Sequence, residues 1–417
     1  MVDAVRAEAD TRPARHADLL RYRSEFPLLQ RSTYLNTCSL GALSGRSRGR
    51  LDRFLGQWDE LGARAWYRHW LDELQGLRDD FGWAVGRPGD EIALAPNVSV
   101  GLATIASALD PIHRGEADAL VRLREAGLPV GGHARPRVIT TALDFPTVGH
   151  QWLARAALGV EVVVLPSPDG LTVPLEAFEE AIDERTALVA TALVYFTTGA
   201  IQDVGALAAI AHERGALLLV DAYQATGLLP SHLETGLPEA SPDVLVSGSL
   251  KWLFGGPGNA FVWVRPELRD ALRPTTSGWF GSARQFEFDV AALDFAPDGR
   301  AYELGTPSVP SAAIARGGID LVREIGIEGI HERTIDLGAL AIRLADAAGL
   351  AVRAVRADAG RGGIVPIAVP DPKRIVDALA ERRIIVDYRP GIVRLSPAFY
   401  NTDDEVSEAI DAIAALV

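Results

Sequence analysis

The chain has 417 residues, of which 48% are hydrophobic, and this is enough apolar material for two subdomains with buried cores. Its net charge of −14 repels the phosphate backbone of nucleic acids and the surface of anionic membranes, so neither is expected as a partner. The single cysteine, Cys38, rules out a disulfide framework and a cysteine-rich metal site within the chain. The N-terminus has no apolar stretch of signal-peptide length, and no segment has the roughly 20 apolar residues of a membrane span, which predicts a cytoplasmic location.

In chain order, residues 1–30 are expected to form a polar N-terminal arm, and the first ordered segment is expected at 33–43. Six apolar or β-branched runs follow, separated by Ala-rich helical patterns: VITTAL (138–143), VEVVVLP (160–166), ALVATALVYF (187–196), ALLLVDAY (216–223), VLVSGS (244–249) and NAFVWVR (259–265). Continuous apolar strands that alternate with helices indicate a mostly parallel sheet covered on both faces. Residues 31–295 are therefore predicted to form a large α/β domain.

The helix between two of these runs has clear ends, because Asp203 can cap its start and Gly215 can terminate it. After about residue 300 the pattern changes to long helices with short strands at 362–369 and 392–396. The last helix opens with Thr402-Asp-Asp-Glu405, which fits a capping box. We expect residues 296–417 to form a smaller C-terminal α/β domain.

A lysine stands just beyond a buried strand in Val246-Ser-Gly-Ser-Leu-Lys251, and glycines follow it. An isolated lysine is usually a solvated surface residue, and an unpaired buried ammonium is costly. A lysine that condenses with an aldehyde avoids part of this cost, and desolvation lowers its pKa so that the amine can act as a nucleophile and later as a base. The position of Lys251 therefore indicates imine chemistry.

Thirty residues earlier, an apolar strand ends in a carboxylate, Asp221. Ligands of open α/β sheets collect at the carboxyl ends of strands, so this side chain is aimed at the expected binding crevice. A lone aspartate there would more often cap a turn. Paired with Lys251, however, it can keep a pyridine nitrogen protonated and so make the ring of pyridoxal 5′-phosphate (PLP) an electron sink.

Taken in order, these residues and several motifs resemble the class V aminotransferase family of fold-type I PLP enzymes, and within it the kynureninase-like branch. The motifs are Tyr34-Leu-Asn-Thr-Cys-Ser-Leu-Gly-Ala-Leu43, Gly86-Arg-Pro-Gly-Asp-Glu91, Phe145-Pro-Thr147, Thr198-Gly199, Gly278-Trp-Phe-Gly281, Glu303-Leu-Gly-Thr-Pro307 and Arg394-Leu-Ser-Pro-Ala-Phe-Tyr-Asn401. The resemblance runs from about residue 33 to the end of the chain. It implies a large domain with a seven-stranded, mostly parallel sheet between helices, and a smaller C-terminal domain.

The resemblance also implies roles for individual residues. Lys251 would form the imine with PLP, and Asp221 would pair with the ring nitrogen. Phe145 would stack on the ring. Further contacts to the cofactor are expected from Val98, Ser99, Thr198, Gln224, Ser247 and Ser249. Trp279 and Thr306 match positions that in the family reach the phosphate of the neighbouring subunit, which implies a homodimer with shared sites.

The expected substrate is a small amino acid, because Arg394 matches the residue that binds its α-carboxylate through a bidentate fork. This arginine lies on a short strand between apolar residues, and these neighbours favour a functional role over that of a solvated surface residue.

Three departures from the kynureninases bear on the reaction. Leu250 stands where they carry a tyrosine before the lysine, Gln224 where they carry a histidine, and Val148 where an aspartate follows Phe-Pro-Thr. We therefore expect a reaction other than kynurenine cleavage. Cysteine desulfurases need a thiol on a loop in the C-terminal half, and Cys38 lies in the N-terminal motif, so persulfide chemistry of that kind is not expected.

The remaining reactions share one carbanion at Cα and differ in its fate. A Cβ–S or Cβ–C lyase acting on a substituted cysteine-like amino acid through an external aldimine and a quinonoid is slightly favoured, with an aminotransferase as the alternative, followed by an epimerase or a decarboxylating enzyme. A nicotinamide-dependent oxidoreductase would need a Gly-x-Gly-x-x-Gly turn after the first strand, which this chain lacks. A non-catalytic PLP-binding regulator would be expected to have lost Lys251, Asp221 or Arg394, and all three are present.

Overall fold

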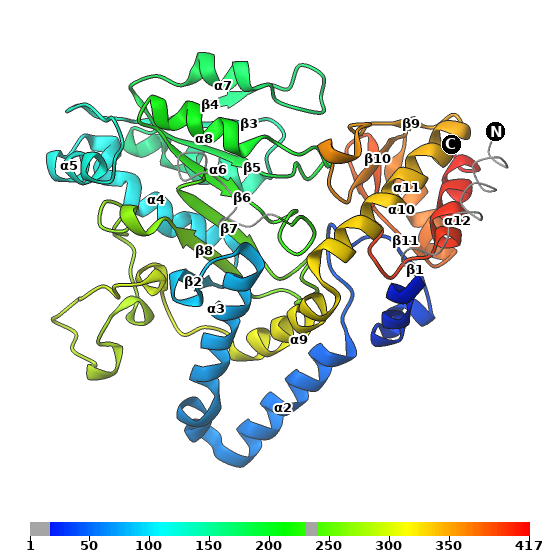
Figure 1. The fold of residues 1–417 in the computed structure, drawn as a ribbon, viewed down its shortest axis with the longest axis horizontal. Helices are drawn as coiled ribbons and strands as arrows, with labels where there is room; N and C mark the ends of the chain where they lie inside the picture. Colours follow the sequence, from blue (N-terminus) through cyan, green and yellow to red (C-terminus); the bar gives the residue numbers. More distant parts are fainter. Residues whose placement is uncertain (1–16, 231–240) are drawn as a thin grey trace.

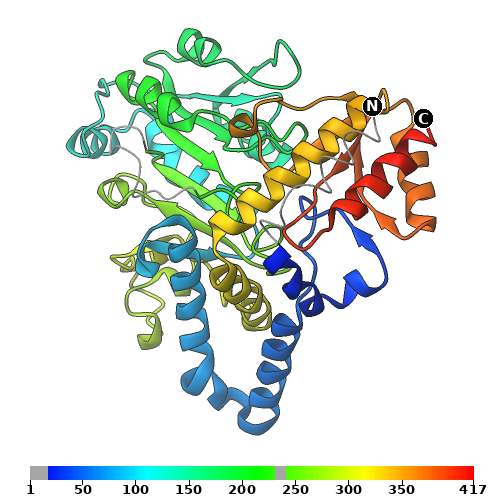
Figure 2. The ribbon, with the colours of Figure 1, turned by 45° about the vertical axis from the view of Figure 1, so that its right-hand side comes forward.

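The computed structural model describes residues 17–230 and 241–417, and these form an α/β fold with a large domain and a smaller C-terminal domain. In the large domain a central sheet lies between helices, and the C-terminal domain lies beside one end of it (Figure 1). The helices α2 (Gly45–Leu61) and α3 (Leu71–Val85) form a long hairpin that extends away from both (Figure 2). Within the described ranges, no helix is long and apolar enough to cross a membrane.

The large sheet has seven strands in the order β2-β8-β7-β6-β5-β3-β4. Its strands are β2 (Ile92–Ala95), β3 (Arg137–Thr141), β4 (Glu161–Leu165), β5 (Thr186–Ala192), β6 (Leu217–Asp221), β7 (Val244–Gly248) and β8 (Ala260–Val264). Strand β8 is antiparallel to both of its neighbours, and the other six strands share one direction. The predicted mostly parallel, seven-stranded sheet is therefore confirmed.

Both faces of this sheet are apolar because helices cover both. Along β6, Leu217 and Leu219 pack with the core on one face, whereas Leu218 and Val220 pack with the core on the other. This alternation follows from the two-residue period of a strand. The remaining helices of the large domain are α4 (Val98–Arg114), α5 (Ala117–Glu125), α6 (Pro146–Leu153), α7 (Leu175–Ala181) and α8 (Val204–Glu213). Helices α4, α5 and α6 share the core of the first face, and α7 and α8 share that of the second.

The C-terminal domain is built on a four-stranded antiparallel sheet with the order β12-β13-β10-β9. Its strands are β9 (Ala351–Val352), β10 (Val365–Ala368), β12 (Asp387–Arg389) and β13 (Ile392–Leu395). The helices of this part of the chain are α9 (Val309–Ile325), α10 (Ile327–Ala347), α11 (Pro372–Glu381) and α12 (Asp403–Ala414). The exact boundary at residue 296 stays a prediction.

The caps expected from the sequence are confirmed. Asp203 accepts a hydrogen bond from the backbone amide of Ala206 at the start of α8. Thr402 and Glu405 form the reciprocal capping box of α12. Strand β2 was not predicted, because its sequence Ile-Ala-Leu-Ala is short and equally compatible with a helix.

The N-terminal segment crosses the molecule between the two domains. Strand β1 (Thr33–Tyr34) pairs in parallel with β11 (Ile384–Ile385), and the bridge between Asn36 and Ser396 continues this contact. The first sixteen residues of the predicted arm lie outside the described residues. Its remainder forms short 3-10 helices, and Phe26 at their junction is fully buried against Phe254 and Tyr400.

Candidate active site

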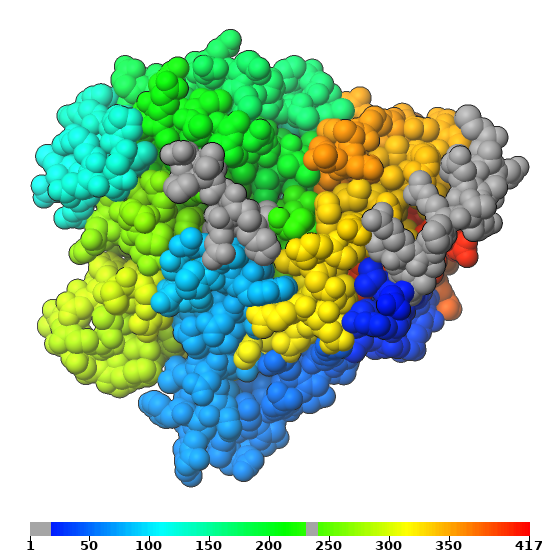
Figure 3. Space-filling model, in the orientation of Figure 1, coloured from blue at the N-terminus to red at the C-terminus, as the bar shows by residue number. Residues whose placement is uncertain are grey.

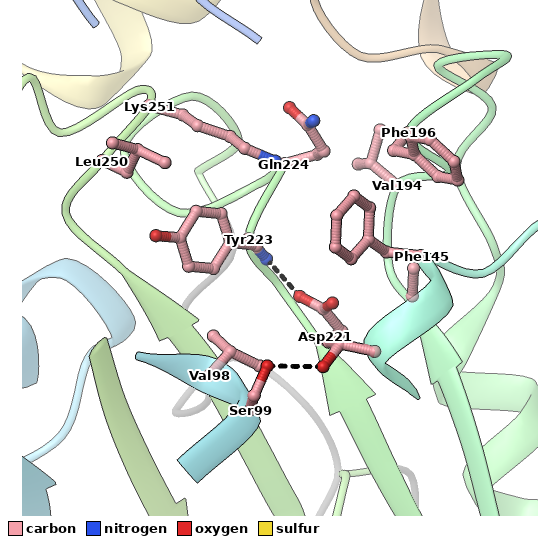
Figure 4. A pocket seen from close by; sticks show the side chains of 12 residues that line it. Val98, Ser99, Phe145, Val194, Phe196, Asp221, Tyr223, Gln224, Leu250 and Lys251 are labelled. Atoms are coloured by element: carbon pink, nitrogen blue, oxygen red, sulfur yellow. Dashed lines mark hydrogen bonds between the residues drawn. The ribbon is translucent and has the colours of Figure 1, made fainter. Parts of the chain in front are cut away.

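A cavity of about 210 Å³ lies at the carboxyl ends of the parallel strands, where the sequence predicted the ligand site. It is lined by Val98, Ser99, Phe145, Thr147, Ala192, Val194, Phe196, Asp221, Tyr223, Gln224, Leu250 and Lys251. These residues come from the ends of β5 and β6 and the segments that follow them, the loop after β7, and the first turns of α4 and α6. Figure 4 shows the Lys251 amine extending above the Tyr223 ring, with the Phe145 ring opposite.

Asp221 ends β6 on the face that α4 covers, because it follows Leu217 and Leu219 at two-residue intervals. Its carboxylate is buried and accepts a hydrogen bond of 2.8 Å from the backbone amide of Tyr223. Burial raises the pKa of Asp221, and the Tyr223 amide and the nearby Lys251 oppose this rise. Among the described residues, no cationic side chain forms an ion pair with this carboxylate, so the site holds a buried acceptor that suits a cationic ligand group.

Lys251 lies in the loop that follows β7, three residues beyond the strand end. Its amine lies 4.7 Å from the centroid of the Tyr223 ring and 5.9 Å from that of Phe145. Burial lowers the pKa of Lys251 from 10.5 to about 8, although the charge of Asp221 acts in the opposite direction. A substantial fraction of the amine is therefore neutral near physiological pH, as a nucleophile or a base requires.

The loop that carries Lys251 is held by the N-terminal segment. The backbone amide of Gly41 donates to the carbonyl of Leu250 at 2.8 Å. A Cβ at Gly41 would lie 2.3 Å from the carbonyl oxygen of Lys251, so only glycine allows this approach.

Gln224 also contacts the N-terminal segment. Its Nε2 donates to the carbonyl of Cys38 at 3.0 Å, and its Oε1 accepts from the Trp252 indole at 3.1 Å. These two bonds fix the orientation of the amide at the edge of the cavity.

The first turn of α4, with Val98 and Ser99, lies on the other side of the cavity from Gln224 (Figure 4). Asn97 caps the helix by accepting from the backbone amide of Val100 at 3.0 Å. The hydroxyls of Ser99 and Thr147 are 2.5 Å apart and both line the cavity. A helix N-terminus with nearby hydroxyls is a favourable place for a phosphate group.

Arg394 is buried, with 1% of its side chain exposed, and lies beside the cavity rather than in its lining. Its guanidinium carbon is 5.9 Å from the ring centroid of Phe196, a lining residue, and its Nη1 donates to the Phe196 carbonyl. Its Nη2 pairs with the carboxylate of Asp387 and donates to Ser39 Oγ at 3.2 Å.

Five residues with predicted cofactor roles lie outside the cavity lining, and Ser247, Ser249 and Thr198 are three of them. Ser247 follows Val246, which is the register partner of Asp221, so its side chain points to the other face of the sheet. Ser249 bonds the carbonyl of Gly256 and shapes the lysine loop. Thr198 donates to the carbonyl of Leu171 at 3.0 Å. Strand parity and local turns decide these orientations, and the roles of the three residues stay predictions.

Trp279 and Thr306 are exposed and lie away from this cavity. Trp279 stacks on Phe288 with ring centroids 6.0 Å apart, in a loop that forms a protruding lobe beside the large domain (Figure 3, yellow-green). Their placement leaves them accessible to a neighbouring molecule.

Sequence reasoning missed Tyr223 and Asp387. Tyr223 lies two residues after Asp221, and this spacing just beyond a strand end was the available signal. The contact of Asp387 with Arg394 depends on a strand pairing that the sequence does not reveal.

Comparison with known proteins gives the family. The model of the aminotransferase class-V family matches residues 131–408. The chain is 33% identical to the uncharacterized aminotransferase YcbU of Bacillus subtilis, over 95% of this chain and 97% of that protein. It is 28% identical to the kynureninase of Pseudomonas fluorescens, over 95% of this chain and 91% of the relative.

Among solved structures, the apo cysteine desulfurase of Thermococcus onnurineus superposes with a TM-score of 0.82 at 20% identity, covering 97% of this chain and 99% of the other. The cystine C-S lyase C-DES, in complex with cysteine persulfide, gives a TM-score of 0.80 at 19% identity, covering 93% and 99%. This chain belongs to the aminotransferase class-V family, as its motifs predicted, and it is a PLP-dependent enzyme.

The residues of the cavity fit PLP. Lys251 supplies a primary amine with a lowered pKa, and Asp221 supplies a buried carboxylate that forms no ion pair within residues 17–230 and 241–417. The capped start of α4 offers backbone amides and the Ser99 hydroxyl to a phosphate. The Phe145 ring provides an apolar wall between them.

Proposed function

We propose that this enzyme is a lyase that cleaves the Cβ–S bond of a substituted cysteine, or a Cβ–C bond in a similar amino acid. The observation that carries this proposal is the neutralisable amine of Lys251 next to the buried carboxylate of Asp221 in one apolar-walled cavity. The chain contains only two lysines, and the other, Lys373, is exposed and paired with Asp377.

In this proposal each residue has a defined task. PLP, when bound, accepts the electron pair that is released at the substrate Cα. Lys251 would hold the cofactor and would remove the proton from the substrate Cα. Asp221 would stabilise a positive charge on the ring nitrogen. Arg394 holds the α-carboxylate, and the first turn of α4 holds the phosphate.

The overall reaction balances with water as the only co-substrate. An S-substituted cysteine and one water would give a thiol, pyruvate and ammonium. The leaving sulfur departs as a thiolate with the electron pair of the Cβ–S bond. The proton that Lys251 removes from Cα balances the charge of this thiolate. The apolar side chains of Val194, Phe196 and Leu250 suit an uncharged substituent on the sulfur.

A screen of S-substituted L-cysteines with purified holoenzyme tests this proposal. Release of thiol and pyruvate in equal amounts is the expected result. The variant Lys251→Ala should lose this activity and the borohydride-fixed mass increase of PLP, whereas the matched variant Lys373→Ala should retain both. Turnover by Lys251→Ala at the parental rate would end the proposal.

Transamination is the second candidate, because the relative at 33% identity is named an aminotransferase. Supplying a 2-oxo acid in the same screen distinguishes the two. Amination of the acceptor without thiol release would identify an aminotransferase. Racemised substrate or released carbon dioxide would identify the epimerase or decarboxylating alternatives.

We also propose that the enzyme works as a homodimer in the cytoplasm, with Trp279 and Thr306 of each subunit at the partner's phosphate site. The exposed aromatic residues support a covered surface, because Tyr67 and Phe288 are 73% and 67% exposed. Light scattering should give twice the chain mass, and a monomeric active enzyme would contradict a shared site.

A further inference from the structure

Three charged side chains form a cluster beside the cavity, and strand geometry explains it. Strands β12 and β13 are antiparallel, and Asp387 lies directly opposite Arg394. Arg389 follows Asp387 by two residues, so both side chains point to the same face of β12. The cluster therefore contains two guanidinium groups and one carboxylate on one face of the small sheet.

Asp387 bridges the two arginines. Its Oδ2 pairs with Arg394 and accepts from the Ser39 hydroxyl, while its Oδ1 accepts from Arg389 Nη1 at 2.9 Å. Burial alone would raise the pKa of Asp387, but Ser39 and the two arginines lower it, so the carboxylate is charged at neutral pH.

The cluster is close enough to the cavity to act on a substrate. The guanidinium carbons of Arg389 and Arg394 each lie 5.9 Å from the ring centroid of Phe196, which lines the cavity. The positive charges of both arginines also disfavour a positive charge on Lys251, and this contributes to the lowered pKa of its amine. The Nε of Arg394 is buried and has no hydrogen-bond partner among the described residues, so this guanidinium retains a free donor.

We propose that Asp387 determines substrate specificity by occupying Arg394 until a substrate carboxylate replaces it. This inference rests on the proposed role of Arg394 as the carboxylate site. A guanidinium as buried as Arg394 needs a countercharge in the free enzyme, and Asp387 supplies it. When the substrate carboxylate takes that place, Arg389 retains Asp387 through the bond to Oδ1.

The charge of the cluster then selects the class of substrate. Two arginines and one aspartate carry one net positive charge, which a single carboxylate balances. A second carboxylate on the substrate side chain would face Asp387 without a further cation, since Lys251 is the only cationic residue among those that line the cavity. The site therefore favours amino acids with an uncharged side chain over dicarboxylic amino acids.

Asp387→Asn tests this selection, because it keeps the shape of the side chain and removes its charge. Dissociation constants would be measured from the absorbance of the bound cofactor on adding S-methyl-L-cysteine, L-glutamate or 2-(methylthio)ethylamine, before turnover. We expect the preference for S-methyl-L-cysteine over L-glutamate to fall by about tenfold or more in Asp387→Asn, the scale of one charged hydrogen bond. Asp387→Glu, which restores the charge, should restore the preference.

Asp358→Asn is the matched control. Asp358 pairs with the buried Arg361, and neither residue lines the cavity. This variant should keep the parental preference. If Asp387→Asn weakens all amino acids equally and leaves the preference unchanged, Asp387 only supports the fold and the inference is wrong.

The third compound, 2-(methylthio)ethylamine, separates a failure of the specificity inference from a failure of the proposed function. 2-(Methylthio)ethylamine lacks the carboxylate, so it should bind more weakly than S-methyl-L-cysteine to the parent enzyme. If it binds as tightly, Arg394 is not a carboxylate site and the proposed function fails with it. If the carboxylate matters but Asp387→Asn leaves the preference unchanged, the specificity inference alone is overturned.

Discussion

The amine of Lys251 lies 4.7 Å from the centroid of the Tyr223 ring, so the single buried lysine of the chain is packed against an aromatic face. Such a face attracts a cation but offers no hydrogen bond to it. The aromatic packing also removes water from the amine, and burial is the main cause of its lowered pKa. The lysine is thereby prepared to react as a neutral amine.

The lowered pKa predicts how cofactor uptake by the apoprotein depends on pH. A pKa of about 8 means that the neutral fraction of Lys251 rises as the pH approaches 8 and changes little above about 9. The rate constant for covalent attachment of PLP, followed by absorbance, should show the same rise and plateau. A rate that continues to increase toward pH 10.5 would mean that Lys251 has the pKa of a solvated lysine.

Asp221→Ala should weaken PLP binding and slow turnover, because it removes the buried countercharge of the ring nitrogen. Loss of one partner of a buried charged pair costs about 3–5 kcal/mol, which corresponds to a loss of two to four orders of magnitude. Equilibrium dialysis gives the cofactor affinity and steady-state kinetics gives the rate. Asp221→Glu keeps the charge and should retain more of both, and near-parental kinetics in Asp221→Ala would place the partner of the ring nitrogen elsewhere.

Glu303 and Arg78 form a buried bidentate ion pair with both contacts at 2.8 Å, and Glu303 also accepts from the backbone amide of Leu94 on β2. Glu303→Ala should lower the free energy of unfolding by about 3–5 kcal/mol, since it leaves Arg78 charged and unpaired in the core. The exposed pair of Glu287 and Arg284 is the control, and Glu287→Ala should cost less than about 1 kcal/mol. Equal losses in denaturant titrations of the two variants would contradict this.

Gly41→Ala should displace the lysine loop, because its Cβ would overlap the carbonyl of Lys251 and lie 2.9 Å from Cα of Phe254. We expect a loss of about 1–3 kcal/mol in stability and slower attachment of PLP. Gly49→Ala is the matched control, since Gly49 lies inside α2 with open space around it. That change should be neutral or stabilising by up to about 1 kcal/mol.

Much of the fold could be predicted because it depends on local patterns. Apolar runs in the sequence predicted six of the seven strands of the large sheet. The rule that ligands collect at the carboxyl ends of strands predicted that Asp221, at the end of β6, belongs to the site. The two residues most central to the site, Lys251 and Asp221, both follow such runs. Their meeting in one cavity agrees with the parallel pairing of β6 and β7.

The remaining features depend on pairing and parity, which sequence patterns do not specify. Ser247 is one position beyond Val246, the register partner of Asp221, and its side chain therefore points away from Asp221. The hydroxyl donors of Ser247 and Ser249 suit a phosphate, but residue type alone does not reveal this orientation. The pairing of Asp387 with Arg394 requires the register of two short strands. The packing of Phe26 against Tyr400, 374 positions later in the chain, is a tertiary contact with no local signal.

The crossing of the N-terminal segment between the domains has a consequence for biosynthesis. Strand β1 pairs with β11, Asn36 bridges Ser396, and the same segment holds the loop of Lys251 through Gly41. The segment that leaves the ribosome early thus finds its partners only after nearly the whole chain has been made. Contacts of such sequence separation form slowly. The last strands must therefore be synthesised before the lysine loop is locked, so the nascent chain acquires a fully formed cofactor cavity only at the end of translation.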